Sequence, residues 1–360
     1  MEKSILIVTH GMGDHDAQSL KKTVVDAANL SLNRYPTIKA RLQQENKAFE
    51  DYVDVVPIEY NNIFEEERQR LVEANKPVSD YFRTVANADL RFVKELVKLE
   101  GKLADDNFYT THLADVLFYA SLLCERVRVQ MLKVLVEVLS GRGNRDVHIL
   151  AHSLGTAAMH DTLEKAFTGG IIDQNTGRRY ALDSTRDKID SLWMVANISN
   201  LLFELNPIRT GFDPYSSRVK PSGTGTGAIR YFYNVYHRFD PFTLFKRFEP
   251  ELEDNWVAAD DFEEIYREIR TKDLFTSKNP HDLGGYLSDP LVADPFLRRV
   301  MPSGTFSPPR EEARQVRDSV VGAFAKIDQI GDHVKEIDSV EDFSAFIKML
   351  KDFKTFIDDL

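Results

Sequence analysis

Residues 147–156 read Val-His-Ile-Leu-Ala-His-Ser-Leu-Gly-Thr, and this stretch is the clearest indication of the fold class. Its first half belongs to a strand predicted over 146–151, Asp-Val-His-Ile-Leu-Ala. Its second half leads into a helix predicted over 156–167. A continuous aliphatic run at 5–8 is typical of a strand buried on both faces of a parallel sheet. Strands that alternate with helices indicate an α/β fold, in which helices flank a mostly parallel sheet. The other predicted strands lie at residues 5–8, 53–60, 189–198 and 228–237.

Local signals add detail to this pattern. Pro57 lacks a backbone N–H and therefore predicts an edge position or a bulge for the strand 53–60. Asp14 or Asp16 can cap the helix that follows the first strand. Residues 174–177, Gln-Asn-Thr-Gly, predict the turn of a small hairpin.

The junction between the strand 146–151 and the helix after it carries a candidate nucleophile. Ala151-His-Ser-Leu-Gly155 matches the nucleophile elbow pattern G-x-S-x-G, with alanine in place of the first glycine. The residues that flank the serine must be small, because the turn is tight. This turn presents the Ser153 hydroxyl at the carboxyl end of the sheet and at a helix N-terminus, where backbone N–H groups favour negative charge. We therefore predict that Ser153 is a catalytic nucleophile.

A serine hydroxyl needs a base, and in the α/β-hydrolase arrangement the chain order is serine, acid, histidine. His281 is the predicted base, because Asn279-Pro-His-Asp-Leu-Gly-Gly-Tyr286 predicts a loop, where catalytic residues are often presented. His160 lies about two turns into the helix after Ser153 and is predicted to be structural. His237 ends a predicted strand, and His333 lies between predicted C-terminal helices.

Asp240 is the predicted acid that orients this base. The strand 189–198 is followed by no carboxylate until Glu204. The next strand ends in Tyr236-His-Arg-Phe-Asp240-Pro241, which places Asp240 just beyond its carboxyl end, where ligands bind in open α/β sheets. The alternative acids are Asp213 and Asp282.

His10-Gly-Met-Gly13 predicts the oxyanion site. A glycine-rich turn after the first strand lets a backbone N–H point at a developing oxyanion, and the residue after the nucleophile supplies a second N–H. We assign the two donors to the backbone N–H groups of Met12 and Leu154, supported by Gly11 and Gly13. The His10 side chain is predicted to hold the loop.

Composition excludes several function classes. The chain has 360 residues, 42% of them hydrophobic, which suffices for a large buried core. A formal net charge of −11 argues against nucleic acid as the main partner and against electrostatic docking on an anionic membrane. No run approaches the ~20 apolar residues of a membrane span, and the N-terminus lacks a signal-peptide core. The single cysteine, Cys124, is predicted to be a buried small hydrophobe; it excludes an intramolecular disulfide and fits a cytoplasmic location.

Two further motifs are not expected to bind ligands. His10, Asp14 and His15 carry metal-ligating side chains, but no matching cluster recurs in the sequence, so no metal is predicted. Gly223-Thr-Gly-Thr-Gly227 is similar to a phosphate loop, yet it leads into a strand and lacks a helix dipole. A flexible connection is expected there, and no cofactor is predicted.

The predicted organisation has a core and two helical parts. Residues 1–62 and 142–300 form the α/β core. Residues 63–141 form a helical insertion, or cap, whose apolar residues suit either an acyl pocket or plain helix packing. Residues 301–360 form amphipathic helices that pack on the core, with a partner or membrane surface as the minority interpretation.

Four segments also point, in order, to one family. They are Ile-Leu-Ile-Val-Thr-His-Gly-Met-Gly at 5–13, Asp-Val-Leu-Phe-Tyr-Ala-Ser at 115–121, the stretch 147–156, and Tyr-Asn-Val-Tyr-His-Arg-Phe-Asp-Pro-Phe at 233–242, continuing to Phe248-Glu-Pro250. In these segments the chain resembles α/β-hydrolases of the lipase type and, more narrowly, the DDHD-domain intracellular phospholipases A. The family's histidine with an aromatic residue shortly after it is similar to His281 with Tyr286.

The resemblance implies an α/β-hydrolase fold and carries over three roles: Ser153 as nucleophile, Asp240 as acid and His281 as base. The chain departs from the family pattern at Ala151 in the elbow. It departs again at Ile198-Ser-Asn200, where family members tend to carry Gly-Ser-Pro. The family's larger lipid-binding modules have no room in 360 residues.

We therefore expect a serine hydrolase that cleaves carboxylic esters through an acyl-enzyme, with a small-molecule or lipid ester as substrate. Peripheral membrane contact through the apolar cap belongs to the lipid version of this hypothesis. Two alternatives stay open. The same triad could serve an acyltransferase or an amidase, or a hydrolase-like fold without activity could serve as a binding or scaffold protein.

Overall fold

The computed structural model describes most of the predicted core and a part of each helical region. The described residues are 2–11, 16–73, 115–116, 118–205, 218–222, 227–237, 240–244, 247–250, 256, 264–271 and 281–319. Much of the predicted insertion 63–141 and most of the predicted helical region 301–360 therefore lie outside the described residues.

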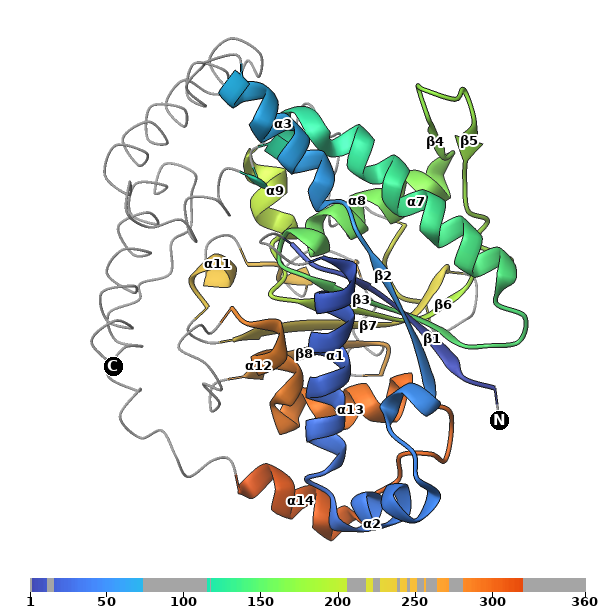
Figure 1. Cartoon of the computed structure of the whole chain (residues 1–360), viewed down its shortest axis with the longest axis vertical. Helices are drawn as coiled ribbons and strands as arrows, with labels where there is room; N and C mark the ends of the chain where they lie inside the picture. Colours follow the sequence, from blue (N-terminus) through green and yellow to red (C-terminus); the bar gives the residue numbers. More distant parts are fainter. Residues whose placement is uncertain are drawn as a thin grey trace.

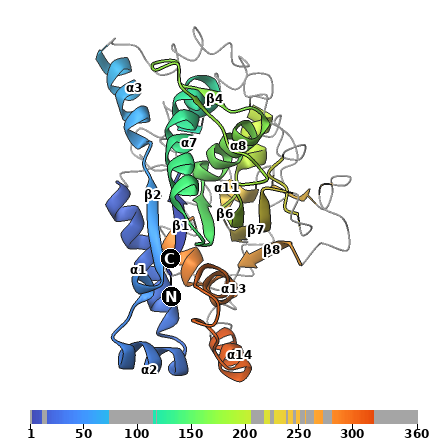
Figure 2. The ribbon, with the colours of Figure 1, turned by 90° about the vertical axis from the view of Figure 1, so that its right-hand side faces the viewer.

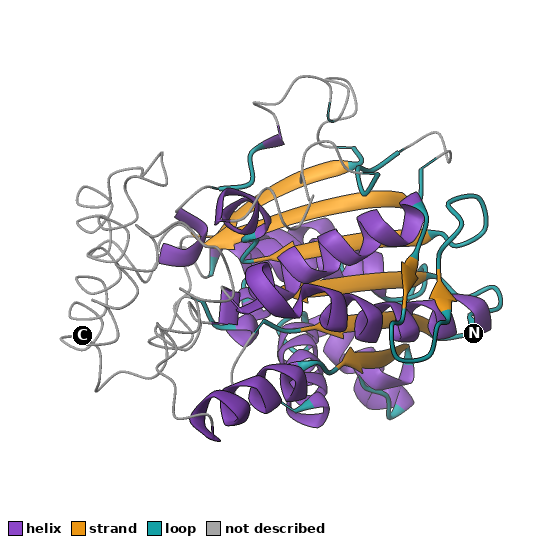
Figure 3. Ribbon diagram, turned by 90° about the horizontal axis from the view of Figure 1, so that it is seen from above, coloured by secondary structure: helices purple, strands orange, loops and turns teal. Residues whose placement is uncertain are grey.

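A six-stranded sheet forms the centre of the molecule. Figure 3 shows its strands in orange among the helices. Its strands are β1 (Ser4–Thr9), β2 (Val53–Ile58), β3 (Val147–His152), β6 (Ile189–Val195), β7 (Ile229–His237) and β8 (Tyr266–Thr271). They lie in the order β2-β1-β3-β6-β7-β8, and each pairs with its neighbours in parallel. The predicted α/β class with a parallel sheet is therefore confirmed.

Burial of the strands follows their place in the sheet. Every residue of β1 and of β3 is buried, because helices cover both faces of these central strands. The edge strand β2 is only partly buried, and it contains Pro57, in agreement with the prediction for 53–60. The opposite edge strand, β8, was not predicted. Its sequence, Tyr-Arg-Glu-Ile-Arg-Thr, carries three charged residues and lacks a hydrophobic run.

The helices lie in two layers, one on each face of the sheet (Figure 1). Alternate residues of β1 belong to different cores: Ile5 and Ile7 to one, Leu6 and Val8 to the other. The first core includes residues of η2 (Tyr119–Leu123), α7 (Cys124–Gly141), α8 (Leu154–Thr168) and α9 (Ser199–Leu205). The second includes residues of α1 (Ala17–Leu32), α2 (Pro36–Glu45), η1 (Phe49–Asp51), α12 (Leu283–Ser288), α13 (Pro290–Val300) and α14 (Arg310–Asp318).

Shorter elements complete the described fold. The Asp16 side chain caps α1 by accepting a hydrogen bond from the Ser19 N–H at 2.7 Å. Strands β4 (Ile171–Ile172) and β5 (Arg179–Tyr180) form the predicted small hairpin, which projects from the body of the molecule in Figure 1. The remaining helices are α3 (Asn61–Glu73) and α11 (Pro241–Leu244).

The chain changes direction across the sheet between β1 and β3. After β1 it forms β2 on one side, and it then returns to place β3 on the other side of β1. In open α/β sheets such a switch point leaves a crevice at the carboxyl ends of the two strands, where ligands bind. Gly11 follows β1 at this point, and Ser153 follows β3.

Helix α8, which follows Ser153, lies beside α7 (Figure 2). A buried ion pair between Arg128 and Asp161 joins the two helices. Arg128 of α7 donates a 2.6 Å hydrogen bond from Nε to Asp161 Oδ2 of α8. The Tyr119 hydroxyl donates to the same oxygen at 2.9 Å. Asp161 is fully buried and Arg128 is 2% exposed. Helix α7 lies within the predicted cap 63–141, and it belongs to the layer that covers the sheet.

The described residues bear on two expectations from composition, the burial of Cys124 and the lack of a membrane-spanning helix. Cys124 is half-buried and packs against the first core, and burial raises the pKa of its thiol. Among the described residues, no helix combines the length and apolar character that crossing a membrane requires.

Removal of the Asp161 carboxylate should strongly destabilise the fold. Asp161→Ala leaves the buried Arg128 guanidinium without its main counter-charge, which typically costs about 3–5 kcal/mol. Urea unfolding measures the free energy of unfolding. The matched control is Glu311→Ala, which removes one partner of the exposed Glu311–Arg314 pair and should leave that free energy nearly unchanged. Equal, small effects of both substitutions would contradict the role assigned to the buried pair.

The buried histidines His148 and His237 should each destabilise the fold as the pH drops from about 6.5 to about 4. Burial lowers the pKa of His148 to about 3 and that of His237 to about 4, so only the unfolded chain binds these protons in that window. Asp115, Asp161 and Asp190 act in the opposite sense, because burial raises the pKa of each carboxyl, that of Asp115 to about 6.

The variant His148→Gln isolates one of these contributions. Its free energy of unfolding should depend less steeply on pH, by up to about 1.4 kcal/mol per pH unit between pH 6.5 and 4. Urea unfolding at several pH values checks this difference, and parallel curves for the variant and the wild-type chain would refute it.

Candidate active site

Ser153 lies at a strained turn between β3 and α8. Its backbone has φ 55° and ψ −130°, a region that non-glycine residues rarely adopt. The turn is fixed on both sides, because the Ser153 N–H donates to the Val195 carbonyl of β6 at 3.0 Å and the Ser153 carbonyl accepts from the Thr156 N–H at 2.8 Å. The strand–turn–helix context expected for 147–156 is therefore present in the structure.

Glycines let two backbone segments approach this turn. A Cβ atom at Gly155 would lie 3.1 Å from the carbonyl carbon and oxygen of His10. A Cβ atom at Gly11 would lie 2.6 Å from the Leu154 nitrogen and 2.8 Å from Ser153 Oγ. The backbone after β1 therefore lies directly against the Ser153 hydroxyl, at a distance that only glycine allows.

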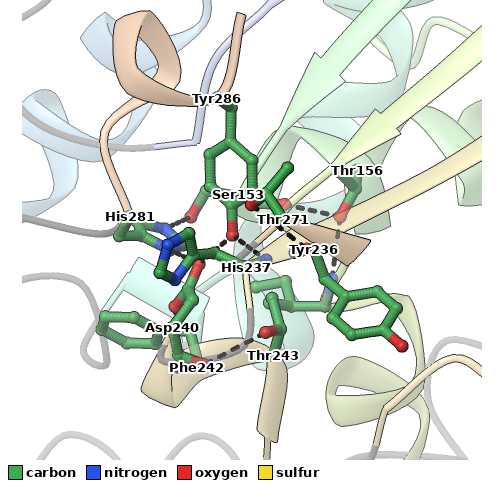
Figure 4. Close-up of polar contacts among 11 residues, drawn as sticks. Ser153, Thr156, Tyr236, His237, Asp240, Phe242, Thr243, Thr271, His281 and Tyr286 are labelled. Carbon is green, nitrogen blue, oxygen red and sulfur yellow. Dashed lines mark hydrogen bonds and ion pairs between the residues drawn. The ribbon is translucent and has the colours of Figure 1, made fainter. Parts of the chain in front are cut away.

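His281 connects Ser153 to Asp240, although these residues are far apart in the sequence (Figure 4). Its Nε2 lies 2.7 Å from Ser153 Oγ, and its Nδ1 lies 2.7 Å from Asp240 Oδ2. His281 directly precedes Asp282, whose side chain caps α12 by accepting a hydrogen bond from the Gly285 N–H at 2.6 Å. The start of this helix therefore sets the position of the imidazole.

Asp240 lies just after β7 and directly before α11, as expected from the sequence. Its carboxylate is fully buried, so each oxygen needs hydrogen-bond donors. Oδ1 accepts from the Phe242 N–H at 3.0 Å. Oδ2 faces His281 and also accepts from the Tyr286 hydroxyl at 2.7 Å.

Two aromatic rings pack near the His281 imidazole. The His152 ring centroid lies 5.0 Å from that of His281, and the Phe242 centroid lies 4.7 Å from it. The His10 ring is 4.7 Å from the His152 ring, so these three imidazoles form a row. The His10 carbonyl also accepts a hydrogen bond from the buried Tyr60 hydroxyl.

Several alternatives from the sequence take other places. His160 is fully buried and packs near the rings of Phe232 and Phe248, away from the triad bonds. His237 lies at the end of β7 without a described contact to Ser153. Asp282 serves as a helix cap. Asp213 and His333 lie outside the described residues.

The predicted oxyanion site lies only in part within the described residues. Leu154 is the first residue of α8, where backbone N–H groups lack helical partners, and Gly11 lies against it. Met12 and Gly13, the other predicted contributors, lie outside the described residues, as do Asp14 and His15. Residues 223–226 of the glycine-rich connection also lie outside them. Within the described ranges, no group of three or more histidine, cysteine or acidic side chains is arranged to hold a metal ion.

Sequence reasoning did not assign a contact to Tyr286, Phe242 or His152. One signal was proximity in the sequence, because each lies within five residues of a predicted triad member. For Tyr286 a second signal was the pattern of a histidine followed shortly by an aromatic residue, His281 with Tyr286. Their contacts connect different strands and helices, so a motif alone does not reveal them.

Comparison of the chain with protein-family models, with curated proteins and with solved structures gives no match. The chemistry of this site therefore has to be inferred from the arrangement of its own residues.

Proposed function

We propose that the chain is a serine hydrolase of the α/β-hydrolase type that cleaves carboxylic esters through an acyl-enzyme. The observation that carries this proposal is the hydrogen-bonded series Ser153–His281–Asp240 at the carboxyl end of a parallel sheet, with both heavy-atom distances at 2.7 Å. The positive φ of Ser153 between β3 and α8 supports it, because this strained turn is the geometry of a nucleophile elbow.

The proton transfers follow from the geometry. A carboxylate can only accept, so Asp240 orients neutral His281 with its proton on Nδ1 and leaves Nε2 to accept the Ser153 proton. The Ser153 oxygen then attacks the ester carbonyl. His281, now an imidazolium beside Asp240, returns the proton to the leaving alcohol. Water, activated by His281 in the same way, hydrolyses the acyl-enzyme and releases Ser153.

The oxyanion of the tetrahedral intermediate would lie between the Leu154 N–H and the backbone around Gly11. The close approach of Gly11 to Ser153 Oγ and to the Leu154 nitrogen supports this position. The dipole of α8 adds partial positive charge at the same point. Met12, next to Gly11, is the proposed second donor, as the sequence indicates.

A lipid or long-acyl ester is the proposed substrate class, and it rests on the resemblance to lipases and on the apolar composition of 63–141. The acidic net charge of −11 means that attraction to a lipid surface would have to come from apolar contacts. A cytoplasmic location is part of the proposal and rests on the single cysteine.

Labelling with a fluorophosphonate probe tests the nucleophile. The probe should react with the native chain and not with Ser153→Ala, and the ester-hydrolysis rate of this variant should fall by about 10⁴-fold or more. Ser288→Ala, which removes another buried serine hydroxyl, is the matched control and should react like the native chain. An unlabelled native chain, or a Ser153→Ala variant that still reacts, would disprove the proposal.

Gly11→Ala should block the oxyanion site. Its methyl group would lie 2.6 Å from the Leu154 nitrogen and 2.8 Å from Ser153 Oγ, so kcat should fall by about 100-fold or more. Gly141→Ala is the matched control, because the added methyl group would have no described atom within 4 Å beyond the adjacent residues and the backbone of its own helix. Ester hydrolysis is measured for both variants, with circular dichroism to verify folding. A folded Gly11→Ala variant with full activity would rule out the proposed oxyanion position.

A further inference from the structure

Tyr286, which is not one of the three predicted catalytic residues, contacts the carboxylate that Asp240 presents to His281. It lies on α12, five residues after His281, and its ring points the hydroxyl toward Asp240 (Figure 4). The hydroxyl donates to Asp240 Oδ2 at 2.7 Å. The same oxygen lies 2.7 Å from His281 Nδ1. Tyr286 and His281 therefore share one carboxylate oxygen.

A second contact fixes the direction of the Tyr286 hydroxyl. The backbone N–H of His237, at the end of β7, donates to the hydroxyl oxygen at 2.8 Å. With this donor in place, the hydroxyl proton is directed to Asp240. Burial, together with the negative charge of Asp240, raises the pKa of Tyr286 well above its usual value. The hydroxyl therefore remains a neutral donor throughout the pH range in which esters are hydrolysed.

We propose that Tyr286 is a positioning residue for the proposed hydrolase reaction, in which its hydroxyl holds the Asp240 carboxylate and moderates the attraction between that carboxylate and His281. The inference rests on the proposed function, because it assigns Tyr286 a part in the activation of Ser153 by His281. It adds a fourth side chain to the series and connects α12 to the end of β7.

The contacts of Asp240 show why one hydroxyl matters. Apart from His281, the donors described for the carboxylate are the Phe242 N–H on Oδ1 and the Tyr286 hydroxyl on Oδ2. Without the hydroxyl, Oδ2 would retain more negative charge toward His281. The imidazolium would then be more strongly stabilised, and His281 would keep its proton to a higher pH. The carboxylate would also be less firmly oriented.

Other titratable or charged groups lie around His281, and removal of the Tyr286 hydroxyl would leave their side chains in place. His152 packs against the imidazole from the β3 side, with 5.0 Å between the ring centroids. His237 contacts the Tyr286 ring, and burial lowers its pKa to about 4. Asp282 adjoins His281 in the chain, and the charge of Arg247 also acts on Tyr286. Removal of the Tyr286 hydroxyl leaves these side chains in place, and the contact that it takes from His237 is that of the backbone N–H.

The test compares Tyr286→Phe with Tyr119→Phe. Both variants remove a buried hydroxyl that donates to a buried aspartate, but Tyr119 donates to Asp161, which lies in the structural pair with Arg128. The rate constant kcat/KM for a soluble ester is measured against pH. For Tyr286→Phe we expect a decrease of about ten- to a hundredfold and an acidic limb displaced to higher pH by about half a unit to one unit. For Tyr119→Phe we expect an undisplaced limb.

A double-mutant cycle separates positioning from a general loss of stability. In the Asp240→Asn background, Tyr286→Phe should cost little further activity, because the carboxylate that it positions is absent. An acidic limb that stays in place or moves to lower pH, or an undiminished loss in the Asp240→Asn background, would overturn the inference.

The failure of the proposed function would look different. In that case the wild-type chain itself would not hydrolyse esters or react with the fluorophosphonate probe. The two tyrosine variants are then compared by NMR titration of the His281 ring signals. The titration should move to higher pH in Tyr286→Phe alone, and an unmoved titration would again overturn the inference.

Discussion

A serine held at φ 55° is the constraint on which the site depends. Such a backbone costs of the order of 1–3 kcal/mol and persists because its surroundings fix it. The parallel pairing of β3 with β6 holds the residue before the turn, and α8 begins immediately after it. Gly11 and Gly155 let the chain after β1 pass close by. This backbone conformation directs the Ser153 hydroxyl toward His281.

A buried carboxylate is the second requirement, and it organises the other half of the site. Asp240 is fully buried, so its charge is tolerated only where donors surround it. The Phe242 N–H, the Tyr286 hydroxyl and His281 Nδ1 supply them from segments on either side of β8 in the sequence. The buried Arg128–Asp161 pair joins α7 to α8 and shares no residue with the contacts of Asp240.

Sequence patterns predicted those parts of the molecule that are determined by residues adjacent in the chain. The elbow at Ser153 follows from an aliphatic strand, small flanking residues and a helix, and the structure has that arrangement. The positions of Asp240 and His281 followed from chain order and from the ends of predicted elements, and the structure brings both to Ser153. The edge strand β8 escaped prediction, because Arg267, Glu268 and Arg270 leave it without a hydrophobic run. The contact of Tyr286 with Asp240 joins α12 to a residue before β8, and sequence spacing carries no signal for such a pair.

We propose that Ser153 forms a covalent acyl intermediate under the control of His281 and Asp240. Rapid mixing with a chromogenic ester, followed by acid quenching and peptide mass spectrometry, tests it most directly. We expect a burst of product with a stoichiometry near one per chain and a matching acyl adduct on the peptide that contains Ser153. Ester turnover without an adduct, or an adduct on a different residue, would contradict it.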